Sequence, residues 1–121
     1  MEWRIELDET FAKEFSTLPS EVKVELRAQA NILKMHGPSY GRPRVDTLNG
    51  SKHANMKELR FDAADGVWRV AFAFDPKRNA ILLVAGDKSG TSEKRFYKKL
   101  IAKADARFDA HLQRLINKEK S

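Results

Sequence analysis

The fold of this chain is decided by residues 56–86, which read MKELRFDAADGVWRVAFAFDPKRNAILLVAG. Three segments that predict strands follow one another in this stretch: Met56–Phe61, Val67–Phe74 and Ala80–Gly86. The segments between them, Ala63–Gly66 and Asp75–Asn79, carry turn-forming residues. Short turns join antiparallel neighbours, so the stretch predicts an antiparallel meander of three strands.

The residues before the meander predict one strand and two helices. Trp3–Leu7 alternates apolar and polar side chains, as a strand with one buried face does. Asp8 can cap a short helix whose apolar residues have near-helical spacing: Phe11, Phe15 and Leu18. Pro19 interrupts this helix, and Ser20 can cap a second one that ends at Gly37-Pro38. The apolar side of the second helix carries Val22, Leu26 and Leu33.

Residues 37–55 are rich in Gly, Pro, Ser, Asn and Lys and predict a loop. We expect the loop to be ordered, because Val45 and Leu48 can pin it to the body of the protein. Loops of this length are unusual in a compact domain and are often functional.

The segment that begins at Ser92 predicts a helix, because its apolar residues recur every three or four positions: Phe96, Leu100, Ala104, Phe108, Leu112 and Leu115. The chain is therefore expected to be a single α+β domain over residues 1–121. Its antiparallel sheet would hold the N-terminal strand and the meander, with a helical pair before the long loop and one helix at the C-terminus.

The composition narrows the class of protein. A chain of 121 residues suffices for one domain with a hydrophobic core. It has no cysteine, which removes disulfides and thiolate sites and fits a reducing cytosol. No apolar run is long enough to span a bilayer, and no apolar region of a signal peptide follows Met1–Arg4. We therefore expect a cytoplasmic protein.

The charge of the chain is strongly positive. Lys and Arg total 23 against 17 acidic residues, a formal net charge of +6. A basic excess in a compact domain favours an anionic partner, such as nucleic acid, an anionic membrane or an acidic protein. The alternative is that the charge only maintains solubility.

The second strand of the meander carries the main functional signal. Alternation places four large apolar residues on one face, which we assign to the core: Trp68, Val70, Phe72 and Phe74. The apolar residues of the preceding strand must join that core, so Glu58 and Arg60 share the opposite face with Arg69. The turn between the strands then sets Arg60 directly opposite Arg69. Facing like charges are destabilising unless acids neutralise them or an anion such as phosphate is the guest.

Two questions remain open on this face. The first is whether Glu58, two residues before Arg60 on the same strand, bridges one or both arginines. Such a bridge is compatible with phosphate binding, because a carboxylate can orient an arginine that also binds phosphate. Ala71 and Ala73 are small, so they leave room above the sheet either for a ligand or for a packed helix.

Two further residues are candidates for this site. Lys88 follows the third strand, where it can reach the arginine pair if that strand neighbours the second. A lysine among positive charges loses its proton more readily and becomes a better base, although a lysine at a strand end is usually only solvated. Tyr97 lies outside the apolar stripe of the last helix, among lysines. An aromatic there suits base stacking, and half-buried packing is the equal alternative.

Basic residues outside this face are candidate contacts for a nucleic acid: Lys52, His53, Lys94, Arg95 and Lys98. The three histidines have no spacing with another His, Cys or acid that indicates a metal site. No glycine-rich phosphate loop, Ser-His-Asp set or paired-carboxylate motif stands out.

Several of these segments, taken in order, resemble the RelE/ParE toxin superfamily, in particular its phage-derived Gp49-like and HigB-like branch. The matching residues are Gly41-Arg42-Pro43, Asp46 to His53, Met56 to Arg60, Trp68-Arg69-Val70, Phe72 to Asp75, Gly86-Asp87-Lys88 and Phe96-Tyr97. The resemblance covers nearly the whole chain. The individual motifs are weak, whereas their order and spacing are fairly specific.

This resemblance implies a RelE-like α+β fold with a curved sheet, and a toxin paired with an antitoxin that often has a helix-turn-helix domain. It also implies cleavage of mRNA in the ribosomal decoding site, with no metal or cofactor. The ribose 2′-OH attacks the adjacent phosphate, a base takes its proton, cations stabilise the developing charge and a donor helps the 5′-oxygen to leave. On this basis Arg60 and Arg69 would bind the phosphate, with Lys88 as first and Lys57 as second choice for the base. Alternation turns Lys57 away from Arg60.

The chain departs from the best-known pattern of the superfamily in one respect. It ends in a long helix, with no tyrosine after a final strand. This leaves the stacking residue open, and it leaves two other functions open as well. One is a ParE-like inhibitor of DNA gyrase, which would cause DNA damage without mRNA cleavage. The other is a non-toxic nucleic-acid-binding relative, which would leave growth normal.

Overall fold

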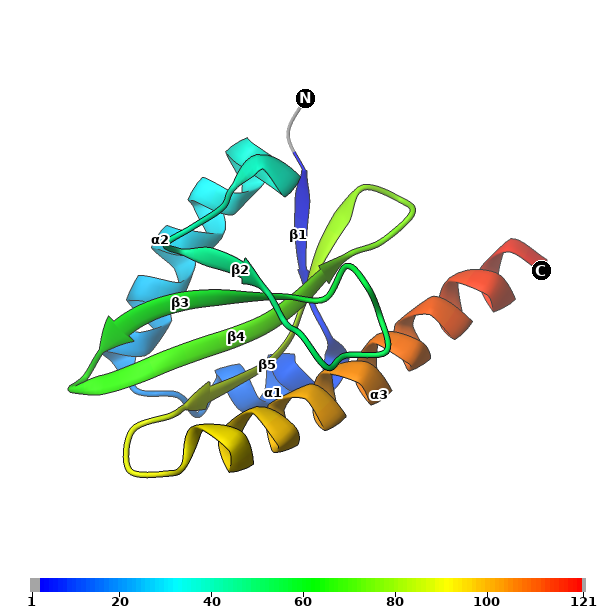
Figure 1. The fold of residues 1–121 in the computed structure, drawn as a ribbon. Helices are drawn as coiled ribbons and strands as arrows, with labels where there is room; N and C mark the ends of the chain where they lie inside the picture. The colour runs from blue at the N-terminus through cyan, green and yellow to red at the C-terminus, as the bar shows by residue number, and fades with distance from the viewer. Residues whose placement is uncertain (1–2, 121) are drawn as a thin grey trace.

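A computed structural model describes residues 3–120 of the chain (Figure 1). Met1 and Glu2, part of the segment in which we expect no signal peptide, lie outside the described residues, as does Ser121. The elements follow in the order β1 (Arg4–Leu7), α1 (Glu9–Phe15), α2 (Ser20–His36), the 3-10 helix η1 (Gly37–Ser39), β2 (Val45–Thr47), β3 (Lys57–Ala63), β4 (Gly66–Phe74), β5 (Asn79–Asp87) and α3 (Glu93–Lys120). The predicted α+β class, with a helical pair before the long loop and a C-terminal helix, is confirmed.

The five strands form one sheet in the order β1-β5-β4-β3-β2. The meander β3-β4-β5 is antiparallel, as predicted. In contrast, β1 pairs with β5 in parallel, so the expectation of an antiparallel N-terminal strand was wrong. A short turn forces two strands to be antiparallel, but β1 and β5 are separated by the helices and three strands, and alternation within a strand carries no information on its direction.

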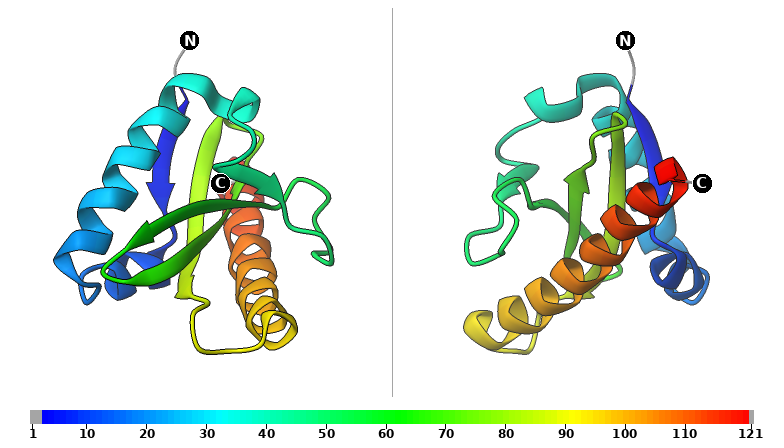
Figure 2. Two further views of the ribbon diagram at one scale, coloured as in Figure 1. Left: turned by 60° about the vertical axis from the view of Figure 1, so that its left-hand side comes forward. Right: turned by 90° about the vertical axis from the view of Figure 1, so that its right-hand side faces the viewer.

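Each face of the sheet is covered by helices, which Figure 2 shows on its two sides. On one face, Phe11 of α1 and the buried residues of α2 pack against Leu59, Phe61, Val70 and Phe72. On the other, α3 packs its apolar stripe from Phe96 to Phe108 against β4 and β5. Ala71 and Ala73 are fully buried in this second core, so the space above these small residues is taken by a helix rather than by a ligand.

The register between β3 and β4 agrees with the prediction. Asp62 lies opposite Val67, and Arg60 lies directly opposite Arg69. The turn between the strands has positive φ angles at Ala64 (50°) and Asp65 (60°), the geometry of a tight two-residue hairpin. This turn fixes which residues face each other along the pair.

The segment between α2 and β3 is ordered around two buried anchors. Val45 and Leu48 are each 4% exposed, in agreement with the prediction that they pin the loop. The loop also contains β2, which pairs with β3 and which the sequence analysis did not predict. Three residues are too few for the alternation of a strand to be recognised.

The start of α2 differs from the expectation in one detail. Ser20 is the first helical residue, and Pro19 occupies the cap position without a side-chain hydrogen bond. Proline has a fixed φ that fits the extended cap conformation, so the helix begins one residue earlier than a serine cap requires.

Asp8 joins β1 to α1 and generates the first prediction. Its buried carboxylate accepts hydrogen bonds from Thr10 N at 3.0 Å and Phe11 N at 3.1 Å. We expect Asp8→Ala to lower the free energy of unfolding by about 1–2 kcal/mol, because two amides at the start of the helix lose their acceptor. Asp8→Asn should recover part of the loss, and Glu9→Ala, at an exposed position, should change little. Urea denaturation measures this, and equal stability of Asp8→Ala and wild type would contradict it.

Candidate active site

A single buried carboxylate lies at the centre of the face that carries the arginine pair. The Glu58 side chain is only 4% exposed. It accepts a hydrogen bond from Arg60 Nη2 at 3.0 Å, lies 3.5 Å from Arg69 Nε and accepts another from the Tyr97 hydroxyl at 2.7 Å. Glu58 therefore bridges both arginines, as the sequence analysis considered possible.

The two arginines have different surroundings. Arg69 is 13% exposed in its side chain, and its Nε donates to the Tyr97 hydroxyl at 3.3 Å. Arg60 is 34% exposed and reaches a second acid, Asp46 of β2, at 3.2 Å. Burial acts to lower the pKa of Arg60, but its hydrogen bond to Glu58 and the charges of Glu58 and Asp46 outweigh this and raise the pKa. Arg60 is thus held fully charged at the surface of the cluster.

Tyr97 links the helix α3 to the sheet. Burial raises the pKa of Tyr97, and the hydrogen bond to Glu58 raises it further, while Arg69 opposes the shift. The phenol therefore keeps its proton at neutral pH and can donate it in a hydrogen bond. The helix comes close here because Gly86 has no side chain: a Cβ at that position would lie 2.9 Å from the Phe96 ring.

Lys88 lies at the edge of the cluster, where its backbone N–H bonds to Val67 O at 2.8 Å. Its Nζ donates to Glu93 at 2.9 Å and lies 5.8 Å from the centre of the Tyr97 ring. The hydrogen bond from Lys88 lowers the pKa of Glu93, so this acid stays ionised. Lys88 therefore lies against Tyr97, which bonds to Arg69 and Glu58, and its amine is held in an ion pair.

A cleft of about 470 Å³ opens beside the cluster. Its walls are residues 46–49 at the end of β2, Glu58 and Arg60 of β3, and Glu93, Lys94 and Tyr97 of α3. A smaller hollow of about 170 Å³ on the other side is lined by Arg44, Arg60 and Arg69, among others. Arg60 is the residue shared by both hollows, so an anion in either would meet its guanidinium.

The structure separates the other predicted site residues into two groups. Lys94, Arg95 and Lys98 are exposed in the first turns of α3, next to Tyr97. Lys52 and His53 instead bind Asp109 in the middle of α3, with His53 Nε2 at 2.8 Å from the carboxylate. These two contacts hold the long loop on α3.

Lys57 stands apart from the arginine cluster, as alternation predicted. Its Nζ donates to Thr47 Oγ1 on β2 at 3.1 Å, and it does not line the cleft. The side chain is therefore directed away from Arg60 and Arg69.

Two acids at the site were missed by the sequence analysis. Asp46 reaches Arg60 only because β2 pairs with β3, and the short β2 has no recognisable pattern. Glu93 was detectable in principle, because it follows Lys88 by five residues across a Ser-Gly-Thr-Ser turn.

Neither a metal cluster nor a membrane span is found in the described part of the chain. Within residues 3–120, no three side chains of His, Cys, Asp or Glu come together in a way that could hold a metal ion. In the same range, no helix is both long enough and apolar enough to cross a membrane.

The amino-acid sequence of the chain matches a known protein family. Residues 13–109, most of the chain, match the family described as phage-derived protein Gp49-like. The chain belongs to the Gp49-like family. This confirms the resemblance that the strand motifs and the Gly86-Asp87-Lys88 segment indicated.

Two relatives from Mycobacterium tuberculosis carry the names of putative toxins. This Gp49-like protein is 45% identical to HigB3 over 93 residues, which are 77% of this chain and 79% of HigB3. It is also 45% identical to HigB2 over 86 residues, which cover 70% of this chain and 42% of HigB2. The chain is therefore a homologue of the HigB proteins.

The fold of this Gp49-like protein is shared with a solved toxin structure. The free state of E. coli toxin RelE, in a mutant with two arginines replaced by alanine, superposes with a TM-score of 0.58. The match covers 85% of this chain and 97% of RelE, at 16% identity. The RelE-like fold predicted from the sequence is confirmed.

The Glu58–Tyr97 contact generates the second prediction. In a Tyr40→Phe background, where Tyr97 is the remaining tyrosine, we expect Glu58→Gln to lower the pKa of Tyr97. Burial persists in this variant, but the negative charge that stabilises the protonated phenol is gone. Ultraviolet titration of tyrosinate measures the effect, and Glu9→Gln is the control for loss of a distant acid. An unchanged or higher pKa of Tyr97 in a folded Glu58→Gln protein would refute the contact.

Proposed function

We propose that this Gp49-like protein is the toxin of a toxin–antitoxin pair and that it cleaves mRNA on the ribosome. One observation carries the proposal: in a homologue of the HigB toxins, two arginines and a tyrosine gather around the buried Glu58 at the edge of a cleft. Guanidinium groups match the oxygens of a phosphate, and a fixed cation beside a reacting phosphate stabilises its developing charge.

In the proposed reaction a ribose 2′-OH attacks the adjacent phosphate. The 2′-oxygen bonds to phosphorus and its proton passes to the base, while the bond from phosphorus to the 5′-oxygen breaks and that oxygen takes up a proton as a 5′-hydroxyl. Arg60, the more exposed arginine, would contact the phosphate directly. Arg69, which is more buried and donates to the Tyr97 hydroxyl, would stabilise the developing negative charge of the phosphate without being the main contact. Tyr97 lines the cleft and offers its ring for base stacking. In this proposal the side chains of Arg60, Arg69 and Tyr97 fill these roles, and no cofactor is added.

Lys88 is our candidate for the general base, and Lys57 is a weaker one because it bonds Thr47 instead. The support for Lys88 is its position beside the Tyr97 ring at the end of β5. Because Lys88 forms an ion pair with the exposed Glu93, its amine already carries a proton. That pair has to open and Lys88 has to release its own proton to solvent before the neutral amine can take the proton of the 2′-OH. The alternative role is that Lys88 remains charged and holds the RNA backbone.

The remaining basic residues would bind RNA around the site. Lys94 lines the cleft, and Arg95 and Lys98 extend the positive surface along α3. Lys52 and His53 would contribute from the loop held on α3, although both are engaged with Asp109. The partners in this proposal are the ribosome with its mRNA, and an antitoxin with a helix-turn-helix DNA-binding domain. The protein would then act in the cytoplasm.

The arginine pair generates the third prediction. We expect Arg60→Ala and Arg69→Ala each to lower the rate of mRNA cleavage by ~10²–10³, because a cation is lost from the transition state. Single-turnover cleavage of ribosome-bound mRNA measures this. Arg78→Asn, at an exposed turn position with a positive φ that asparagine tolerates, removes an equal charge and should keep the rate. Wild-type rates for both arginine variants, or DNA damage on induction without mRNA cleavage, would overturn the proposed function.

The role of Lys88 generates the fourth prediction. If Lys88 is the base, Lys88→Arg should be nearly as damaging as Lys88→Ala, because arginine stays protonated. If it only holds RNA, Lys88→Arg should keep much of the activity. The measurement is the cleavage rate across pH. A near-wild-type rate for Lys88→Arg with an unchanged pH profile would remove Lys88 from the catalytic residues.

A further inference from the structure

The outer edge of β1 is open. β1 is the terminal strand of the sheet and pairs only with β5 among the described strands. Arg4 N bonds to Arg78 O at 3.3 Å and Asp8 N bonds to Leu82 O at 2.9 Å, so alternate residues of this strand turn their main chain toward β5. The peptide groups of Ile5 and Leu7 therefore point outward, where they meet no other strand of residues 3–120.

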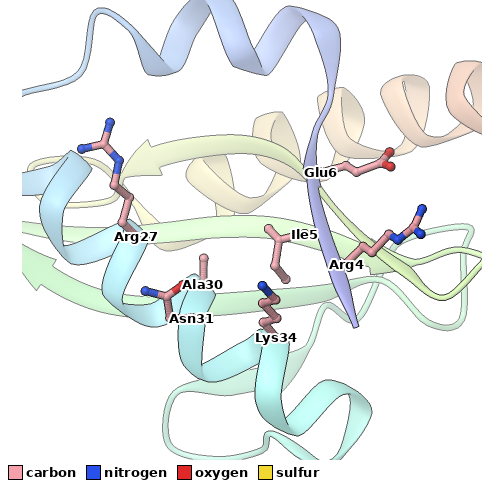
Figure 3. Close-up of a pocket in the computed structure, with 7 residues that line it drawn as sticks. All are labelled: Arg4, Ile5, Glu6, Arg27, Ala30, Asn31 and Lys34. Atoms are coloured by element: carbon pink, nitrogen blue, oxygen red, sulfur yellow. The ribbon is translucent and has the colours of Figure 1, made fainter. Parts of the chain in front are cut away.

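A groove runs along this open edge. It has a volume of about 520 Å³ and lies between β1 and one side of α2 (Figure 3). The residues that line it are Arg4, Ile5 and Glu6 from β1, and Arg27, Ala30, Asn31 and Lys34 from α2. At one end, Trp3 N bonds to Lys34 O at 3.0 Å, which closes the groove against the end of α2. The edge is thus recessed beside a helix.

Three cations and one acid line the groove. Arg4, Arg27 and Lys34 line it, and within residues 3–120 none of the three forms an ion pair. Glu6 is the one acid among the lining residues. By contrast, the cations of the candidate active site, Arg60 and Lys88, are each paired with an acid of the chain. Unpaired cations beside a groove favour an acidic occupant.

The outer side of α2 next to the groove is apolar. Val24 and Met35 are 64% and 68% exposed. At 100° per residue, both lie beside Asn31 on the helix surface, immediately outside the groove. A segment that occupies the groove could therefore place an apolar side chain against α2 and acidic side chains against its cations.

We propose that this groove binds an extended acidic segment of the antitoxin, which adds to β1 as a further strand. The proposal rests on the proposed function for the existence of that partner. A free strand edge is satisfied by the main chain of another polypeptide, and RNA offers no equivalent row of donors and acceptors. Ile5 and Leu7 supply that row, while Arg4, Arg27 and Lys34 select an acidic sequence. A short charged edge can also serve only to prevent aggregation, but that role requires no groove.

The position of this edge has a consequence for regulation. β1 is at the opposite end of the sheet from β2 and β3, which carry the Asp46 and Arg60 part of the candidate active site. A segment bound along β1 would hold the antitoxin without entering the cleft. Neutralisation would then require either a second contact of the antitoxin or exclusion of the toxin from the ribosome by bulk.

The fifth prediction tests this groove with the full chain and the protein encoded by the adjacent gene. In an Arg60→Ala background, which permits expression of the toxin alone, we expect Arg4→Glu with Lys34→Glu to weaken the complex at least tenfold, because two attractive charges become repulsive. The control, Lys13→Glu with Lys120→Glu, makes the same change in net charge at exposed positions outside the groove and should leave the Kd unchanged.

Hydrogen exchange provides the second measurement. The amides of Ile5 and Leu7 should become protected when the complex forms, and that of Glu6, which faces β5, should change little. A tight complex with an unchanged Kd for the groove variant and no protection at Ile5 and Leu7 would overturn the groove proposal and leave the proposed function standing. A groove variant that loses ribosome binding but keeps the antitoxin would also overturn it. If the adjacent protein forms no complex and wild-type toxin does not cleave mRNA, the proposed function fails and this inference fails with it.

Discussion

The structure around the candidate site depends on one buried negative charge, the carboxylate of Glu58. Removing a carboxylate from water costs several kcal/mol unless opposite charges and hydrogen bonds replace the lost solvation. Arg60, Arg69 and Tyr97 provide that replacement from two strands and a helix. In return, Glu58 relieves the repulsion between two guanidinium groups that the hairpin register sets opposite each other.

The contact between Tyr97 and Glu58 requires the start of α3 to lie close to the sheet. Tyr97 reaches Glu58 only if the start of α3 lies close to the strands, and Gly86, Ala71 and Ala73 are small enough to allow that approach. The same helix carries the exposed Lys94 and Lys98 beside the cleft. Packing of the second core and the position of Tyr97 beside Glu58 both depend on where α3 lies, so a change in either is expected to affect the other.

Two sets of cations on this molecule have different surroundings. In the candidate active site, acids hold the cations nearest to Tyr97: Arg60 is held by Glu58 and Asp46, and Lys88 by Glu93. Such pairing fixes the position of a cation and leaves an anionic guest to compete for it. In the groove along β1, Arg4, Arg27 and Lys34 form no ion pair within residues 3–120, and they lie beside main-chain groups that bond to no other strand of that range. The first arrangement suits a precisely placed phosphate, and the second suits a flexible acidic polypeptide.

The sequence by itself determined the elements with a strong local pattern. Alternation in β3 and β4 and a short turn between them were enough to set Arg60 opposite Arg69 and to turn Lys57 away, because both follow from the two-residue period of a strand. Only the tertiary structure decided the contacts between distant segments. It showed that β1 runs parallel to β5, that α3 fills the space over Ala71 and Ala73, and that β2 brings Asp46 to Arg60. It also showed that Lys52 and His53 contact Asp109 of α3. These outcomes depend on how separate elements pack, and periodicity within one element contains no information about its neighbours.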